Sequence, residues 1–299
     1  MYPEIAHWGF LHIRSYGLML AIAFLVGTWL GLKEARRIGL DPDHLVTVIL
    51  ATLVSSVLGA RLLYVLEHLD EFRASWSSVL AVWQGGLTLY GGVVAGTAAG
   101  LYTARRLGMP MWQAADALAP STALGTMFGR IGCFLNGCCY GRPTRMPWGV
   151  VYPPDSFPGL EFGETKIHPA QLYNAAFGLA LFGVLWSVRA RVRTPGALFW
   201  GFIISFSVGR IGLDFYRAYE PAARIGSLGG MDITESQLVS LALALFAVLM
   251  LIRVRREASS AAGTAAPGAS PAAPPAPPVA PPAIPPAAPP AAPPVSETP

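Results

Sequence analysis

Charged side chains are scarce in this chain, and their scarcity excludes an ordinary soluble domain. Only 13% of the 299 residues are Asp, Glu, Lys or Arg, and 53% are apolar, whereas an average soluble domain is about 25% charged. Apolar stretches recur along residues 1–257, and most lack the polar face that a soluble helix needs. Helices of about 20 such residues cross about 30 Å of hydrocarbon. The composition therefore predicts an all-α, polytopic membrane protein that has the bilayer as its main partner.

Cysteine is also rare, and its spacing does not favour a metal site. The three cysteines, Cys133, Cys138 and Cys139, are an odd number, so they cannot all pair within one chain. Their C-x4-C-C spacing differs from the usual C-x2-C of zinc sites, and no histidine follows at a suitable interval. We therefore favour structural packing over a disulfide in an oxidising outer compartment, and place metal binding last.

Two further patterns are missing. The N-terminal sequence MYPEIAHWGFLHIRSYG has neither a basic region nor a small-residue cleavage site, so we expect no removable signal peptide. Basic residues form short clusters at the ends of apolar stretches rather than a nucleic-acid signature. No nucleic-acid partner is expected.

Seven apolar stretches are long enough to span a membrane, and basic residues indicate their direction. We expect spans at about 16–34, 45–66, 85–104, 112–135, 170–188, 196–216 and 235–252. Basic clusters follow the odd-numbered spans, and include Arg36, Arg106, Arg189 and Arg255. Because positive charge marks the cytoplasmic side, odd-numbered spans run inward and the N-terminus lies outside.

Two segments outside the spans have distinct compositions. Residues 140–168 are rich in glycine, proline and aromatics, and are expected to form a small extracytoplasmic head. Residues 258–299 are dominated by proline and alanine and cannot bury a core. We therefore expect residues 1–257 to form the membrane domain and residues 258–299 a disordered cytoplasmic tail.

Three arginines inside the predicted spans point to an anion. Arg61, Arg130 and Arg210 each lie near the outer end of an outward-running span, hence at similar depth. Each costs up to about 2.5–3.5 kcal/mol at the midplane, and a guanidinium cannot shed its proton. Snorkelling, or pairing with Asp214 or Glu67, is the structural alternative. The unbalanced positive charge and the planar fork of arginine favour a phosphate.

Other polar and glycine-rich features are predicted at the same depth. Tyr16 opens the first span from outside, and the glycine-rich segment 84–92 opens the third. Asn136 and Gly141 follow the fourth, and His168 opens the fifth. Single tyrosines and histidines at this level are often membrane anchors, and glycine pairs are often packing devices. The shared depth of all these features favours a site.

The sequence GRIGCFLNGCCYG (129–141) resembles the signature G-R-x-G-N-F-x-N-x-E-x-x-G of the prolipoprotein diacylglyceryl transferase family. Supporting blocks occur in the family's order across roughly residues 14–255, namely SYGLM, GARLLY, GGLTLYGG, HPAQLY and GRIGLDFYR. The family is described as seven-spanning with its N-terminus outside. The resemblance implies the same arrangement here.

The resemblance also implies a reaction. The cysteine thiol of a prolipoprotein lipobox, in the signal peptide, attacks the glyceryl carbon of phosphatidylglycerol. A thioether-linked diacylglycerol forms and glycerol phosphate leaves. This chemistry requires no metal or organic cofactor. The implied location is the bacterial inner membrane, with the active site facing the outer leaflet.

The resemblance assigns roles to individual residues. Arg130 matches the signature arginine that binds lipid, and Arg210 matches a second essential arginine. Other positions of the pattern fall on Tyr16, Arg61, Asn136, Gly141, Asp214 and Arg217. The thiol, with a pKa near 8.5, must lose a proton. Tyr90 and His168 are both candidates for the base.

Departures from the family pattern leave rival interpretations open. Cys133 and Cys138 stand where the signature has Asn and Glu, Tyr90 where some members have His, and Phe206 where many have Tyr. A diverged homologue with another acceptor would fit these changes. A transporter of an anionic lipid or solute is a second alternative, although transporter sites lie near the midplane and often come with inverted repeats. A redox protein using the three cysteines is a third.

Overall fold

The chain folds mainly into long helices. The computed structural model describes residues 4–8, 11–73, 76–82, 85–219, 224–228 and 231–264. The long helices are α1 (Ser15–Ile38), α2 (Pro42–Glu67), α4 (Leu89–Arg106), α5 (Met111–Asn136), α7 (Ala170–Val188), α8 (Ala197–Asp214) and α9 (Glu235–Thr264). Short helices are α3 (Leu69–Phe72), η1 (Trp76–Leu80) and α6 (Phe157–Phe162). The strands are β1 (Glu4–Trp8), β2 (Leu11–Arg14), β3 (Arg224–Leu228) and β4 (Met231–Thr234).

The chain divides into two compact units, Met1–Ser259 and Ser260–Pro299. The first unit contains the helical bundle. Of the second, the structure describes only residues 260–264, where α9 continues past the boundary predicted at residue 257. The remainder of the predicted tail lies outside the described residues.

Several helices are suited to a membrane, which confirms an all-α membrane protein in outline. Within the described ranges, five helices are long and apolar enough to cross a bilayer: α1, α2, α7, α8 and the part of α9 up to Ser260. Helices α4 and α5 coincide with the third and fourth predicted spans but do not meet the same standard. Helix α4 contains Gly91, Gly92, Gly96 and Gly100 and ends in Arg105 and Arg106, and α5 contains Asp116, Pro120 and Arg130.

Local sequence explains where the helices begin and end. Gly39, with φ of 79°, ends α1, and Gly137, with φ of 81°, ends α5. Asp41 caps α2 by accepting a hydrogen bond from the Asp43 amide at 2.9 Å, and Pro42 occupies the first turn. These are the residue types that favour C-terminal and N-terminal helix caps.

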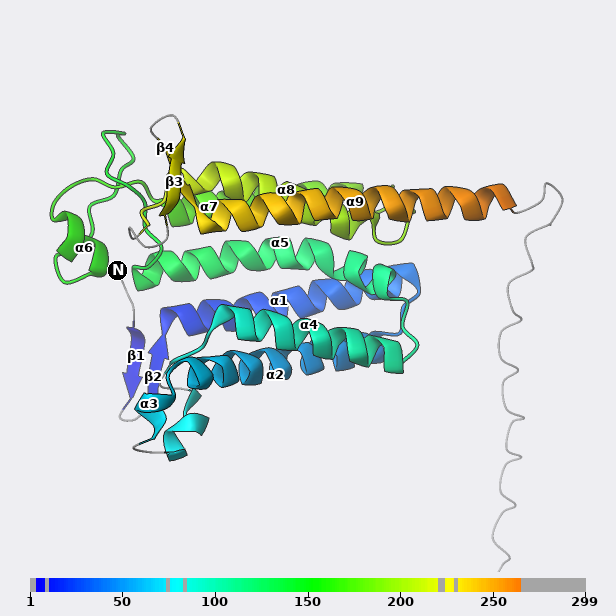
Figure 1. Cartoon of the computed structure of the whole chain (residues 1–299), viewed down its shortest axis with the longest axis horizontal. Helices are drawn as coiled ribbons and strands as arrows, with labels where there is room; N and C mark the ends of the chain where they lie inside the picture. Colours follow the sequence, from blue (N-terminus) through cyan, green and yellow to red (C-terminus); the bar gives the residue numbers. More distant parts are fainter. Residues whose placement is uncertain are drawn as a thin grey trace, which may run out of the picture. The chain divides into compact units, whose positions relative to one another are not determined.

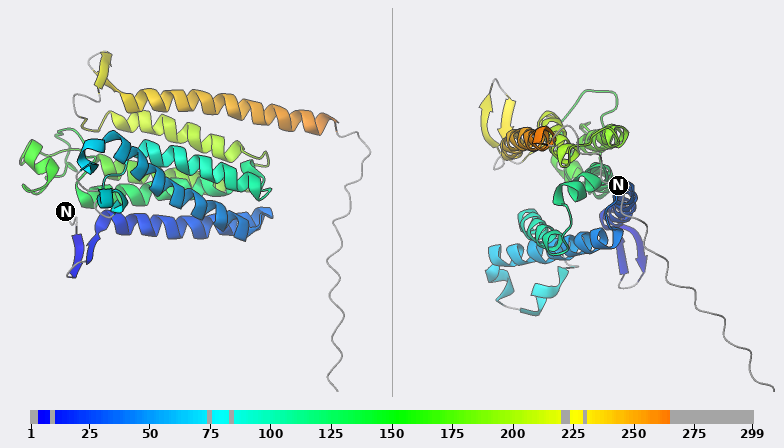
Figure 2. Two further views of the ribbon diagram at one scale, coloured as in Figure 1. Left: turned by 60° about the horizontal axis from the view of Figure 1, so that its bottom comes forward. Right: turned by 90° about the vertical axis from the view of Figure 1, so that its right-hand side faces the viewer.

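Helix α5 lies at the centre of the bundle, against α1, α7 and α8 (Figure 1). Helix α4 pairs closely with α2, and the two views in Figure 2 show them side by side. Glycine permits this approach, because a Cβ at Gly59 would lie 2.6 Å from the carbonyl oxygen of Gly91. A Cβ at Gly92 would lie 3.1 Å from the carbonyl oxygen of Ser56. Gly91 and Gly92 of the glycine-rich segment thus pack against α2, which is the structural alternative to a role in the site.

The non-helical elements gather at one end of the bundle (Figure 1). The antiparallel hairpins β1–β2 and β3–β4, with α3 and α6, lie where α1, α4, α7 and α9 begin and where α2, α5 and α8 end. We call this the hairpin end. The predicted basic clusters lie at the opposite end, which we call the basic end. The alternation of helix direction thus places the polar residues singled out in the sequence at the hairpin end.

Candidate functional site

Arg210 and Asp214 form the first part of a polar cluster at the hairpin end. They lie one turn apart in α8, with Arg210 Nη2 3.8 Å from an Asp214 carboxylate oxygen. Arg210 also donates from Nε and Nη2 to the hydroxyl of Ser236, at 3.1 and 2.9 Å. Ser236 belongs to the first turn of α9, so Arg210 links two helices. The Arg210–Asp214 pair, which was the structural alternative to an anion site, is therefore present, but it is long.

Tyr219 extends the cluster from Asp214 to Arg217. The Tyr219 hydroxyl donates to Asp214 Oδ1 at 2.9 Å and accepts from Arg217 Nη1 at 3.1 Å. Asp214 is only 3% exposed, yet among the described residues its Oδ2 has no hydrogen-bond partner, and neither does the buried Nε of Arg217. Buried polar groups normally have partners. These two atoms are therefore unsatisfied by the residues that the structure describes.

Arg130 approaches the same cluster from α5. It is half-buried, and no described residue forms a hydrogen bond or an ion pair with it. The guanidinium of Arg130 lies close enough to Tyr16 for an electrostatic interaction. Arg130 and Arg217 both interact electrostatically with Cys139. Arg210 and Arg217 therefore lie near the Asp214 carboxylate, and Arg130 and Arg217 lie near Cys139. The excess positive charge suits an anion, and arginine's fork suits a phosphate in particular.

Close backbone packing fixes the segments that carry these residues. A Cβ at Gly132 would lie 3.1 Å from Tyr16 Cδ2, so α1 and α5 approach closely beside Arg130. Gly141 forms an isolated bridge with Arg217, and a Cβ there would lie 2.8 Å from the Tyr216 carbonyl oxygen. Glycine at position 141 is thus required for the head segment to pass beside α8.

His168 lies in an aromatic cluster adjoining Gly141. Its Nδ1 is 3.0 Å from the Tyr173 hydroxyl, which also accepts from Trp148 Nε1 at 2.7 Å. The His168 ring packs edge-on against Tyr216 with centroids 5.2 Å apart. Burial lowers the pKa of His168 below its ordinary value. The imidazole is therefore neutral, and able to accept a proton, over a wider pH range.

Tyr90 and Arg61 lie on the α2–α4 pair. Tyr90 is in the first turn of α4 and is 64% exposed. Arg61 is 7% exposed and donates hydrogen bonds to the carbonyl oxygens of Ser78, Val79, Gly85 and Gly86 at 2.6–3.0 Å. These bonds fasten the segment that leads into α4. Gln84, in the same segment, lies outside the described residues.

Glu67 does not balance the charge of Arg61 within the described part of the chain. No ion pair joins them there, and the Glu67 carboxylate instead accepts from the Thr88 hydroxyl at 2.9 Å. Carbonyl oxygens therefore solvate the guanidinium of Arg61, which gives it a structural role.

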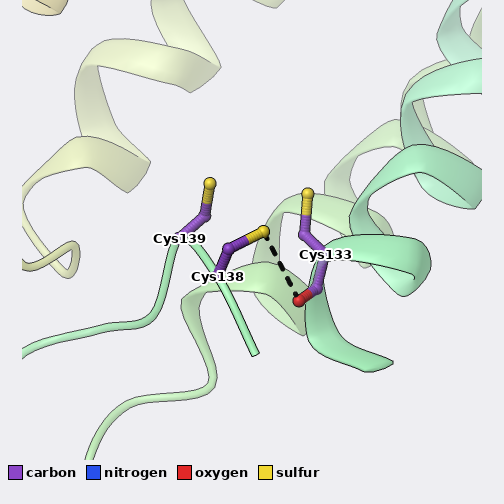
Figure 3. A group of neighbouring side chains, drawn as sticks. All are labelled: Cys133, Cys138 and Cys139. Carbon is purple, nitrogen blue, oxygen red and sulfur yellow. Dashed lines mark hydrogen bonds between the residues drawn. The ribbon is translucent and has the colours of Figure 1, made fainter. Parts of the chain in front are cut away.

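The three cysteines meet where α5 ends. All are free thiols, and their sulfur atoms lie within 4.8 Å of one another (Figure 3). The Asn136 side chain, at the last residue of α5, lies against Cys138, whose thiol is 3.8 Å from the Cys133 carbonyl oxygen. Hydrogen bonds from the Cys133 and Cys138 thiols lower the pKa of Cys139, and the charges of Arg217 and Arg130 lower it further.

Ser236 and Tyr219 were missed in the sequence. Both are ordinary polar residues near predicted span ends, and their role depends on which helices are neighbours. Tyr219 lies two residues after Arg217 in the stretch that follows α8. That proximity was the only available signal, and nothing in the sequence pairs Ser236 with Arg210.

A cavity of about 270 Å³ lies at the basic end, far from this cluster in the bundle. Its buried Glu34 binds Arg37, with the closest contact at 2.5 Å, and Arg189 at 3.1 Å. Asp116 accepts hydrogen bonds from the amides of Gly196 and Phe199, which begin α8. These acidic groups are fully engaged in holding helices together. We therefore assign the candidate site to the hairpin end.

Comparisons with known proteins place the chain among membrane transferases. Residues 3–253 match the family described as prolipoprotein diacylglyceryl transferase. A protein of Geobacter sulfurreducens is 35% identical over 85% of this chain and 95% of its own length. A protein of Synechococcus elongatus is 34% identical over 84% of this chain and 86% of its own length. A protein of Solidesulfovibrio magneticus is 36% identical over 84% of this chain and 94% of its own length. All three are named phosphatidylglycerol–prolipoprotein diacylglyceryl transferase.

Proposed function

The chain belongs to the prolipoprotein diacylglyceryl transferase family, and on this premise we propose that its arginine cluster binds the phosphate of phosphatidylglycerol. The chain is a membrane transferase of lipoprotein maturation, as its relatives' names indicate. Its substrates are phosphatidylglycerol and a prolipoprotein. The transporter and redox alternatives are not favoured, because the match to this family covers most of the chain.

The observation that carries the proposal is the unpartnered charge of Arg130. A half-buried guanidinium without a hydrogen bond or ion pair from the described residues is costly unless a ligand supplies the counter-charge. The unpaired Nε of Arg217 adds a donor in the same region. Arg210 supplies a second charge, held in place by Ser236 and Asp214. Together these groups match a phosphate diester that carries one negative charge.

The reaction makes a stronger demand on these arginines than binding does. The acceptor thiolate attacks the glyceryl carbon that bears the phosphate, so a carbon–sulfur bond forms as the carbon–oxygen bond breaks. The bonding electron pair departs on the phosphate oxygen, and glycerol phosphate leaves with one more negative charge. Guanidinium groups aimed at that oxygen stabilise the transition state more than the ground state.

The proton of the acceptor thiol has two candidate destinations. His168 is neutral near pH 7, adjoins Gly141 and is oriented by Tyr173. Tyr90 lies in the first turn of α4 and is exposed. In the proposal His168 is the first candidate and Tyr90 the second, since burial has already tuned the imidazole for proton acceptance.

The remaining predicted positions take supporting roles. Tyr16, Asn136 and Gly141 shape the wall of the site around Arg130, while Asp214 and Arg217 orient the phosphate through Tyr219. Arg61 acts at a distance, by fastening the segment before α4.

The proposed topology has seven spans, with α4 and α5 crossing alongside the five more apolar helices. The N-terminus and the hairpin end then face the outer leaflet of the bacterial inner membrane, and the basic end faces the cytoplasm. An acceptor in this site is a signal peptide with its lipobox cysteine at the outer surface. Residues 258–299 form a cytoplasmic tail outside the 1–257 transferase domain.

The test is transfer of labelled diacylglycerol to a lipobox peptide by purified variants. Arg130→Ala and Arg210→Ala should each lose at least one charge-assisted hydrogen bond of about 1.5–3 kcal/mol, or roughly 10–150-fold in rate. Arg130→Lys and Arg210→Lys should also be impaired, because the planar fork is lost. Arg105→Ala, at the basic end, removes an equal charge and should retain activity. Well-folded Arg130→Ala and Arg210→Ala proteins with near-normal rates would refute the site.

A further inference from the structure

We propose that Cys133, Cys138 and Cys139 form a binding site for one thiophilic metal ion, monovalent copper in particular. The three thiols come from the last turn of α5 and the two residues after Gly137. Figure 3 shows them gathered around one small region between the helix end and the following loop. The transfer reaction needs none of them, because the reacting thiol belongs to the acceptor.

The distances suit three-coordinate binding. The three sulfur atoms lie within 4.8 Å of one another. Metal–thiolate bonds of about 2.3 Å place the sulfurs of a planar trigonal site about 4.0 Å apart. Closing the site therefore requires shifts of less than about 1 Å, which rotation about the side-chain bonds provides. Soft thiolate ligands select Cu(I) and zinc among biological metals.

The backbone is shaped to bring the thiols together. Cys139 has a φ of 61°, and among the described residues it is the one non-glycine residue with positive φ. The left-handed conformation is unfavourable for a non-glycine residue. Gly137, two residues earlier, is also left-handed, with a φ of 81°. This double reversal turns the chain back, so that Cys138 and Cys139 lie beside Cys133. Strain of this kind is characteristic of binding sites.

The surrounding charge favours a monovalent ion. Arg130 and Arg217 both lie within electrostatic range of Cys139. Three thiolates around Cu(I) carry two negative charges, which these two guanidinium groups balance. Three thiolates around divalent zinc carry only one negative charge, so the two guanidinium groups would leave one positive charge unbalanced. Binding displaces the thiol protons to solvent and involves no change of oxidation state.

The site has a consequence for catalysis that rests on the proposed function. Arg130 and Arg217 serve the phosphate of phosphatidylglycerol in that proposal, and a bound copper–thiolate group would compete for their charge. Copper should therefore raise the KM for phosphatidylglycerol. Because binding is measurable without any transfer assay, failure of the site and failure of the proposed function are separable.

The chain contains only three cysteines, so no other thiol competes with them for the metal. The reduced, full-length protein is titrated anaerobically with Cu(I) against a competing chelator, and bound copper is counted per chain. One equivalent is expected, and copper should protect all three thiols from alkylation, as read by intact mass. Mutation of a residue that hydrogen-bonds to a metal-binding side chain lowers metal affinity about 10–100-fold. Loss of a ligand in Cys139→Ser should therefore cost about 100-fold or more.

Two controls and three outcomes complete the test. His44→Ser removes an exposed imidazole from the second helix at the basic end and should leave binding unchanged. The triple serine variant should bind no copper. Failure of the reduced wild-type protein to bind one equivalent, or full alkylation in the presence of copper, would overturn the site. Tighter binding of zinc than of Cu(I) would overturn the charge argument. An unchanged KM for phosphatidylglycerol in copper-loaded protein would overturn the competition.

Discussion

Arg130 and Arg210 are expected to differ in how much they contribute to the stability of the protein, although we propose that both act in transfer. Arg210 is tied to Ser236 by hydrogen bonds of 2.9 and 3.1 Å and lies 3.8 Å from the buried Asp214. Arg130 has no such partner among the described residues. Removing Arg210 therefore breaks protein contacts, whereas removing Arg130 relieves a half-buried charge. Alanine substitution separates the two roles.

The size of the difference follows from these contacts. The two bonds to Ser236 share one acceptor, so we count them as one charged hydrogen bond of about 1.5–3 kcal/mol. Loss of the long ion pair adds to this, because Asp214 remains buried with only Tyr219 donating to it. Arg210→Ala should cost about 3 kcal/mol, or roughly 6–12 °C in Tm on the scale of domains of 150–250 residues. Arg130→Ala should stay within about 0.5 kcal/mol, roughly 2 °C.

The assay is thermal unfolding of both variants in the same detergent and at one scan rate, because unfolding of such a protein is often irreversible. Transfer activity is measured on the same preparations. Ser236→Ala is the matched control for Arg210, since it removes the same hydrogen bonds and keeps the charge. An Arg130→Ala protein as destabilised as Arg210→Ala would show that Arg130 holds the fold, and its role as the free phosphate ligand would be wrong.

Three further predictions test the surroundings of the site. Tyr219→Phe removes the hydroxyl that bridges Asp214 and Arg217, and should lower kcat/KM for phosphatidylglycerol roughly 10-fold. Steady-state rates equal to wild type would show that Tyr219 does not position Arg217 for transfer. Because burial lowers the pKa of His168, transfer activity should persist below pH ~6.5 and fall only as the pH drops through the lowered pKa. If a His168→Gln protein loses activity over the same acidic pH range as wild type, His168 is not the base and Tyr90 becomes the candidate. A periplasm-dependent reporter should be active when inserted within residues 140–168 and inactive when fused after Arg256, and the reverse pattern would refute the proposed orientation.

The sequence predicts the long helices well because apolar length is a local property. The predicted span at 170–188 coincides with α7, and the span at 112–135 differs from α5 by one residue at each end. The glycines of segment 84–92 predict a close approach by another backbone or a lipid, but not that α2 is the neighbour. The hairpins β1–β2 and β3–β4 were not predicted, since each strand is too short to show a clear alternation of polar and apolar residues.

The candidate site is predictable only in part, because its contacts join distant segments. The equal depth of Arg130 and Arg210 follows from their positions along two helices that run in the same direction. The same argument groups Arg61 with them, but its donors are occupied by the carbonyl oxygens of residues 78–86. Depth alone does not reveal which side of a helix an arginine faces. The meeting of the three thiols depends on the left-handed turn at Cys139, which sequence spacing does not indicate.

The most direct test of the account is a product balance for the purified wild-type chain. Phosphatidylglycerol labelled separately in its diacylglyceryl and phosphate groups is incubated with a lipobox peptide, and the products are identified by mass. The account predicts one thioether-linked diacylglyceryl peptide for each glycerol phosphate released, with no phosphorus on the peptide. Phosphorus on the peptide, or free diacylglycerol in place of the thioether, would contradict attack by the thiol at the glyceryl carbon.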